Sequence, residues 1–210
     1  MLILFDGIPG SGKTTFAQRL CLHLQQLGHP ARWHHEHDGN HPVIPPGVGA
    51  HGAQAHLQKR IAAWRNFASA VKTGSETVIL ESSLSQLQVN GFVRAKQIQS
   101  INGFYDKIFS AIGSLRPILI DFRQAAIATH LKSVRASRGK DTFKGLIQGI
   151  RQSSFGGESS APGIKLLTEY FTIIQDVAIS LSKQFPRKVI PVNIIADRFI
   201  SDRIFFKVSG

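Results

Sequence analysis

The fold of this chain is decided by a stretch near its start, Gly7-Ile8-Pro9-Gly10-Ser11-Gly12-Lys13-Thr14. It matches in full the pattern G-x-x-x-x-G-K-[ST], in which glycines let the backbone turn tightly and aim N–H groups at phosphate oxygens. The lysine of this pattern reaches the outer phosphates of a nucleoside triphosphate, and the Ser/Thr hydroxyl binds Mg²⁺. The stretch therefore predicts that residues 7–15, ending at Thr15, bind ATP and Mg²⁺, with Lys13 on the β- and γ-phosphates and Thr14 on the metal.

The flanking residues place this loop between a strand and a helix. Residues 2–5 form a short apolar run that predicts a buried strand, and residues 14–27 carry apolar side chains at helical spacing before Gly28 ends the helix. The positive end of a helix dipole at the loop favours a bound phosphate.

The rest of the chain alternates between the same two kinds of element. Apolar runs predict strands, periodic segments predict helices, and the prolines and glycines before residue 52 predict a long loop. The strands are expected at residues 31–34, 77–80, 117–122 and 188–194, and the helices at residues 53–71, 125–138 and 165–183. Pro191 suits an edge or an end of the sheet. This order predicts an α/β three-layer sandwich, with a central parallel sheet of about five strands and helices on both faces.

Composition limits the size and the partners of the protein. A chain of 210 residues with 42% hydrophobic composition can bury one substantial core, so we expect a single domain over residues 1–210. The formal net charge of +12 calls for a polyanionic partner, and nucleic acid stays open beside a nucleotide. No apolar run approaches the roughly 20 residues of a membrane helix. With a single cysteine, Cys21, and no signal-peptide pattern, the chain is expected to be cytoplasmic and to bind no membrane.

A family resemblance is carried by the opening of the chain and by two later segments. The opening has an acidic-Gly start and a Gly-Ser-Gly-Lys-Thr-Thr close, in Phe5-Asp6-Gly7-Ile8-Pro9-Gly10-Ser11-Gly12-Lys13-Thr14-Thr15. It resembles P-loop kinases of the nucleoside and nucleotide kinase group, including thymidylate kinase. In that group the third strand ends in an acidic residue followed by arginine, whereas Glu81-Ser82-Ser83 keeps the acid and lacks the arginine. Residues 135–140, Arg135-Ala136-Ser137-Arg138-Gly139-Lys140, resemble the group's mobile lid.

The resemblance implies an ATP-dependent phosphotransferase that moves the γ-phosphoryl group to a small-molecule acceptor, with a lid around residues 125–160. Adenine contacts are expected from the lid helix and from residues 193–197. Two alternatives stay open. One is a nucleic-acid-linked ATPase or polynucleotide kinase, favoured by the charge, and the other is a nucleotide-binding module without catalysis, favoured by the missing arginine.

Side chains after the strands are the candidates for chemistry, because ligands of parallel sheets bind at the carboxyl ends of the strands. Glu36, Glu81 and Arg123 are therefore expected to meet the phosphate loop. Glu81 can bind the metal or its water, or accept the proton of the attacking hydroxyl, and the competing interpretation is a solvent-exposed acid. Asp121 is a second candidate acid, and Asp6 is expected to orient the loop or a metal-bound water.

Residues 33–42 are rich in histidine and acids, Trp33-His34-His35-Glu36-His37-Asp38-Gly39-Asn40-His41-Pro42. In the related kinases the segment after the second strand holds the acceptor, so we expect Glu36, His37 and His41 to bind it. A zinc site fits poorly, because no cysteine joins the histidines and Gly39 breaks a helix that would align two of them. A solvated loop remains the other interpretation.

Arg135 and Arg138 are the lid cations that the resemblance assigns to catalysis. Guanidinium groups stabilise the charge that spreads over a transferring phosphoryl group. A spacing of three residues puts both on one face of a helix. The competing interpretation is a basic helix end that the helix dipole favours. Residues 153–160, rich in Ser and Gly, are expected to form a flexible loop near the mouth of the site.

Overall fold

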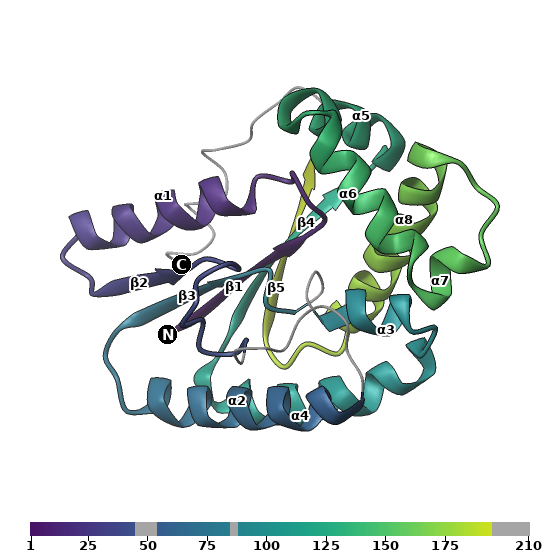
Figure 1. The fold of residues 1–210 in the computed structure, drawn as a ribbon. Helices are drawn as coiled ribbons and strands as arrows, with labels where there is room; N and C mark the ends of the chain where they lie inside the picture. Colours follow the sequence, from purple (N-terminus) through teal and green to yellow (C-terminus); the bar gives the residue numbers. More distant parts are fainter. Residues whose placement is uncertain (45–53, 85–87, 195–210) are drawn as a thin grey trace.

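A five-stranded parallel sheet forms the centre of the computed structural model, which describes residues 1–44, 54–84 and 88–194 (Figure 1). The strand order is β2-β3-β1-β4-β5, with every neighbouring pair parallel. The strands are β1 (Leu2–Gly7), β2 (Ala31–His34), β3 (Thr77–Glu81), β4 (Ile118–Gln124) and β5 (Lys188–Ile194). The phosphate loop therefore follows the middle strand of the sheet.

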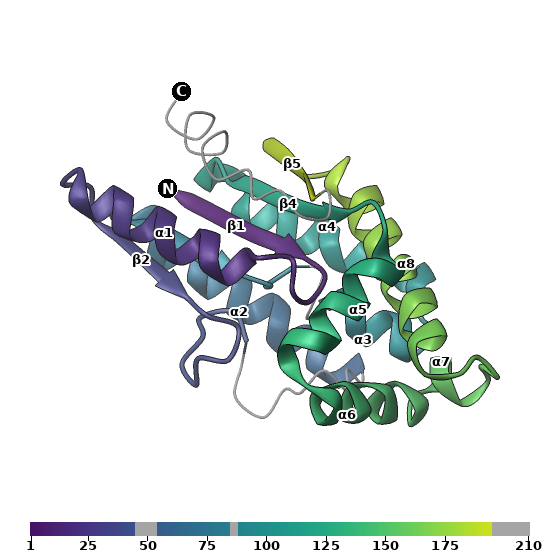
Figure 2. The ribbon, with the colours of Figure 1, turned by 90° about the horizontal axis from the view of Figure 1, so that it is seen from above.

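Helices cover both faces of this sheet. The longer ones are α1 (Lys13–Gln26), α2 (Gln54–Lys72), α4 (Ile101–Ile112), α5 (Ile127–Arg138), α6 (Lys140–Arg151) and α8 (Gly163–Ser182). The short ones are α3 (Asn90–Arg94), α7 (Ser154–Gly157) and the 3₁₀ helices η2 (Ile98–Ser100) and η3 (Gly113–Leu115). In Figures 1 and 2, α1 lies on one face of the sheet and α2 and α4 lie on the other.

Side-chain alternation along β1 divides the core between the two faces. Leu2 and Leu4 pack with α2, α4 and α8, whereas Ile3 and Phe5 pack with α1. All four side chains are at most 1% exposed. A strand that buries both faces reads as a continuous apolar run, which is why residues 2–5 predict a central strand.

The predicted fold class is confirmed, and most element bounds agree within a few residues. β2 and β5 have the predicted bounds, and β5 lies at the edge of the sheet, where the missing N–H of Pro191 is tolerated. The predicted loop after β2 runs partly outside the described residues. The division of the chain into one domain with a lid over residues 125–160 remains a prediction.

Several regions differ from the sequence-based expectation, among them α3 and α6, which form where no element is expected. Residues 101–112 form α4, to which the sequence analysis assigns no element, although its buried side chains have helical spacing. The flexible loop expected at residues 153–160 is wrong in part, because α7 begins there. Ser153 caps this turn by accepting a hydrogen bond from the Gly156 N–H at 3.3 Å. Gly156 is buried so closely against α6 that an added Cβ would lie 2.1 Å from the Ile150 oxygen.

Within the described part of the chain, no helix has the length and apolar character to span a membrane.

Candidate active site

A cavity of about 460 Å³ lies where the sheet meets the phosphate loop. This volume is within the range of small-molecule sites. The lining side chains come from the loop, from the segment after β2, from the end of β3 and from α5. They are Pro9, Gly10, Gly12, Lys13, Thr14, Thr15, Glu36, Glu81, His130, Ser133, Val134, Ser137 and Arg138. Segments far apart in the sequence therefore share one polar cavity.

The loop takes its shape from close approaches that glycine permits. Gly7 has φ +143°, and an added Cβ would lie 2.6 Å from the Phe122 oxygen of β4. Gly10 has φ +80°, and its Cβ would lie 2.4 Å from Val134 Cγ2 of α5. A larger residue at either position would be strained and would push β4 or α5 away from the loop.

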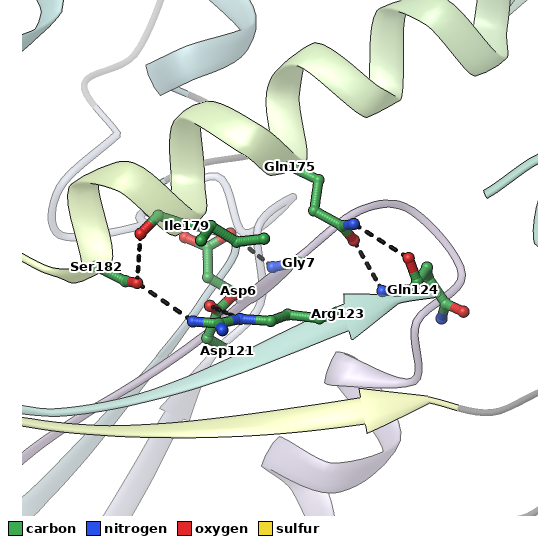
Figure 3. A network of polar contacts seen from close by, with 8 residues as sticks. All are labelled: Asp6, Gly7, Asp121, Arg123, Gln124, Gln175, Ile179 and Ser182. Carbon is green, nitrogen blue, oxygen red and sulfur yellow. Dashed lines mark hydrogen bonds and ion pairs between the residues drawn. The ribbon is translucent and has the colours of Figure 1, made fainter. Parts of the chain in front are cut away.

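Asp6 orients the loop from behind, as expected from its position. Its Oδ1 accepts a hydrogen bond from the Gly7 N–H at 2.8 Å, and its Oδ2 accepts one from the Leu84 N–H at 2.9 Å. These bonds connect the ends of β1 and β3. Figure 3 shows the bond to Gly7. Asp6 does not line the cavity in the described part of the chain.

Lys13 is only 5% exposed, and its Nζ donates a hydrogen bond to the Ile8 oxygen at 3.2 Å. Burial lowers the pKa of this ammonium group, and the negative charges of Glu36, Asp6 and Glu81 oppose that shift. The structure therefore holds a buried cation inside the loop with carboxylates close enough to stabilise it.

Thr14 and Glu81 are in contact and line the same cavity. The Thr14 hydroxyl donates to Glu81 Oε1 at 2.5 Å. Glu81 is 2% exposed, and its Oε2 is buried with no hydrogen-bond partner among the described residues. Burial raises the pKa of this carboxyl group, while the Thr14 hydrogen bond and Lys13 lower it. This burial contradicts the solvent-exposed alternative.

The Thr14–Glu81 pair also suits a magnesium ion. A hydroxyl and a carboxylate are hard oxygen ligands, and Mg²⁺ in nucleotide sites takes one or two such protein groups together with substrate phosphates. The unpartnered Glu81 Oε2 is a further oxygen that could bind the metal or a water on it.

Ser82 stands where the resembling kinases carry arginine. It has φ +55° and is fully buried. The next residue, Ser83, is 1% exposed. A long cationic side chain is therefore absent from the start of the segment after β3.

The two predicted lid arginines occupy different places. Both are exposed, but Arg138, at the end of α5, lines the cavity and Arg135 does not. The Arg135 oxygen accepts a hydrogen bond from the Gly139 N–H, which ends the helix. Only Arg138 of this pair is brought to the phosphate loop.

Arg123 does not meet the phosphate loop, contrary to the sequence-based expectation. Its Nε donates to Asp121 Oδ2 at 2.7 Å, and its NH2 group donates to the Ser182 hydroxyl of α8 at 3.3 Å (Figure 3). Burial raises the pKa of the Asp121 carboxyl group, and Arg123 opposes this. Arg123 and Asp121 therefore form a partly buried ion pair on β4, which Arg123 connects to α8 through Ser182, and neither residue lines the cavity.

The histidine-rich segment contributes one residue to the cavity. Glu36 lines it, and its Oε1 lies 3.4 Å from Nε2 of His37. The His37 side chain is 78% exposed and lies outside the lining. His41 is 4% exposed and also lies outside it, with its Nδ1 accepting a hydrogen bond from the Val43 N–H. In the described residues no group of three or more His, Cys, Asp or Glu side chains could hold a metal ion, so zinc finds no support here.

His41 gives a prediction about acid stability. Burial, with a smaller contribution from His34, lowers the pKa of His41 from 6.5 to about 4. The unfolded chain binds a proton at this residue near the higher value, so the free energy of unfolding falls as the pH falls from 6.5 towards 4. His41→Gln has no imidazole to protonate. When the pH is lowered from about 7 to about 5, its free energy of unfolding should therefore decrease by roughly 1–2 kcal/mol less than that of the wild type.

Urea denaturation at both pH values measures the difference. His37→Gln, at the exposed histidine of the same segment, is the matched control and should keep the wild-type pH dependence. Parallel pH dependences for His41→Gln and the wild type would contradict the prediction.

His130 is a cavity residue that the sequence analysis missed. Its Nε2 lies 2.8 Å from the Pro9 oxygen, so a hydrogen bond joins α5 to the phosphate loop. Burial lowers the pKa of this imidazole, although the bond to Pro9 raises it. His130, Ser133, Val134 and Ser137 recur at helical spacing, and this stripe ending at Arg138 is the signal that would have found them.

Removing the His130 bond should loosen the loop. We expect His130→Ala to weaken ATP binding by about 3–10-fold, the effect of one hydrogen bond of about 1 kcal/mol. His130→Gln can still donate to the Pro9 oxygen and should keep most of the affinity. Calorimetric titration with an ATP analogue measures both variants, and equal losses in the two would argue against the hydrogen bond.

Comparison with known proteins identifies similar folds, at low sequence identity. No protein-family model matches the chain, and neither does any curated protein. Thymidylate kinase from Ehrlichia chaffeensis is a structural neighbour with a TM-score of 0.50 and 14% identity, over 100% of this chain and 96% of that one. Deoxyadenosine kinase from M. mycoides with bound dATP has a TM-score of 0.49 and 15% identity, over 100% of both chains. The chain has the P-loop fold of the nucleoside and nucleotide kinases.

Proposed function

We propose that the chain is an ATP-dependent P-loop kinase that transfers the γ-phosphoryl group to a small-molecule acceptor. The observation that carries this proposal is the contact between Thr14 of the loop and the buried Glu81 in one cavity with Lys13. A phosphate loop alone serves any nucleotide-binding protein. The added buried carboxylate supplies the proton acceptor or metal ligand that phosphoryl transfer to a hydroxyl requires.

The proposal assigns roles to the phosphate loop, to Glu81 and to the two arginines of α5. Backbone N–H groups of the loop at residues 7–15, apart from Gly7 and Pro9, and the Lys13 ammonium bind the phosphates of ATP. Thr14 and Glu81 would hold Mg²⁺, which neutralises phosphate charge when bound. Glu81 would also accept the proton of the acceptor hydroxyl. Arg138 would stabilise the transferring group, and the exposed Arg135 would serve as a second cation of the lid.

Consumption of ATP with a panel of acceptors tests the proposal. The panel contains nucleosides, nucleotides, sugars and aminoglycosides, and Lys13→Ala protein is the blank. We expect at least one acceptor to stimulate ATP consumption above the blank, which would also exclude a nucleotide-binding module without catalysis. Identical rates for wild type and blank with every acceptor would contradict the proposal.

A nucleic-acid-linked ATPase or polynucleotide kinase is the second candidate. It is favoured by the net charge of +12 and by the exposed cations along α5 and α6, which include Lys132, Arg135, Lys140 and Lys144. Binding through phosphates weakens steeply with salt. A gel shift with RNA and DNA at increasing salt distinguishes the candidates, since the small-molecule kinase predicts no specific shift.

A further inference from the structure

We propose that the acceptor is a hydroxyl compound without a phosphate group, neutral or amine-bearing, and that Glu36 binds it. The proposal rests on the kinase function above and narrows the class of its acceptor. The argument comes from the distribution of charge in the cavity.

The strand order separates the charges of the cavity. Glu36 follows β2 and Glu81 ends β3, and both strands lie on the same side of β1. Arg138 belongs to α5, which follows β4 on the other side. Lys13 stands between them, at the start of α1. One wall of the cavity is therefore acidic and the opposite wall basic.

Glu36 has an oxygen for a ligand to bind. Its side chain is 14% exposed, its Oε1 faces His37, and its Oε2 is buried without a hydrogen-bond partner among the described residues. A buried carboxylate oxygen without a donor is unfavourable, and hydroxyl or ammonium groups are the donors that satisfy it. Thr14 already contacts the neighbouring Glu81. Glu81 is assigned above to the metal and the reacting hydroxyl, so Glu36 is the acid that can bind the other donor groups of the acceptor.

The acidic wall would repel a phosphate group on the acceptor. Phosphate oxygens at neutral pH accept hydrogen bonds and carry negative charge, so Glu36 and Glu81 would repel them. The lysine and arginine among the described lining residues are Lys13 and Arg138, both assigned above to the phosphates of ATP. The residues that follow Glu81 are the buried Ser82 and Ser83, which bring no cation.

Matched pairs of acceptors test the inference. Thymidine is compared with thymidine monophosphate, and glucosamine with glucosamine 6-phosphate. Calorimetry measures their binding to protein saturated with Mg²⁺ and a non-hydrolysable ATP analogue. We expect the phosphate-free member of a pair to bind at least roughly 10-fold more tightly, the scale of one lost charge-assisted contact together with repulsion.

Three variants test whether the Glu36 carboxylate itself determines acceptor binding. Glu36→Gln should weaken binding of the phosphate-free member by roughly 10-fold while changing affinity for the ATP analogue little. Glu36→Lys should narrow or reverse the preference within a pair, because it places a cation on the acidic wall. Glu158→Gln removes an exposed carboxylate outside the cavity and should behave as wild type.

Tighter binding of the phosphate-bearing members to wild-type protein would overturn the inference. So would an unchanged preference in Glu36→Gln with altered affinity for the ATP analogue alone, since Glu36 would then be merely the partner of Lys13. A clear preference for phosphate-free members without turnover of any of them would count against the kinase function and leave the class of acceptor supported.

Discussion

Lys13→Ala is expected to lower phosphoryl transfer by about 100-fold or more, the size of effect seen when a preorganised charge contact to a transition state is lost. Lys13 is the lysine that the structure buries inside the loop, with its Nζ 3.2 Å from the Ile8 oxygen. Steady-state kinetics with the best acceptor of the panel gives the ratio of the wild-type rate to the variant rate. Both kcat and kcat/KM should fall, because the contact strengthens as charge moves to the γ-phosphate.

The folded state should tolerate this change. Burial disfavours the charge of Lys13, as its lowered pKa indicates, so an uncharged residue is not expected to reduce the midpoint of thermal unfolding. Lys72→Ala, at the exposed end of α2, is the matched control and should retain full activity. Wild-type turnover in purified Lys13→Ala protein would remove the basis for assigning phosphate binding to this loop.

Glu81→Gln is expected to reduce kcat by about 100-fold while changing ATP affinity by less than about 3-fold. The amide keeps the shape of the side chain and can still accept the Thr14 hydrogen bond, yet it has no charge for a metal and is a poor proton acceptor. Single-turnover rates and nucleotide titrations, made on the same preparation, measure the two quantities.

The magnesium dependence of Glu81→Gln distinguishes the two roles of Glu81. A metal-binding role predicts a higher Mg²⁺ concentration for half-maximal activity, whereas a role as proton acceptor predicts the wild-type concentration with a lower maximum. Asp141→Asn, on the exposed surface of α6, is the control and should change neither value. Unchanged kcat in Glu81→Gln would leave Glu81 with a structural role.

The sequence predicted the fold well because its strongest signals are local. The run of residues 2–5, the glycines of the loop and the periodic apolar residues of α1 each specify an element from within a few residues. Strands at residues 31–34 and 188–194 have the predicted bounds. The rule that parallel strands direct ligands to their carboxyl ends then placed Glu36 and Glu81 near the loop, and both line the cavity.

The position of a side chain was predicted wrongly or missed where its partner in the fold differs from the one that the sequence suggests. Arg123 follows the same rule as Glu81, but the buried Asp121 lies two residues away on the same strand and pairs with it. His41 was expected at the ligand, and it is buried against the His34 ring instead. His130 was missed because its hydrogen-bond partner is a backbone oxygen 121 residues earlier. The helical spacing of the lining residues on α5 indicates that face of the helix but does not identify this partner.

The strand order also bears on how chains of this kind can diversify. β1 carries the phosphate loop in the middle of the sheet, with β2 and β3 on one side and with β4, followed by α5, on the other. Substitutions in the segment after β2 alter one wall of the cavity and spare the opposite wall, because the loop stands between the two. In the kinase proposed above, such substitutions would change the acceptor and leave the contacts with the nucleotide in place.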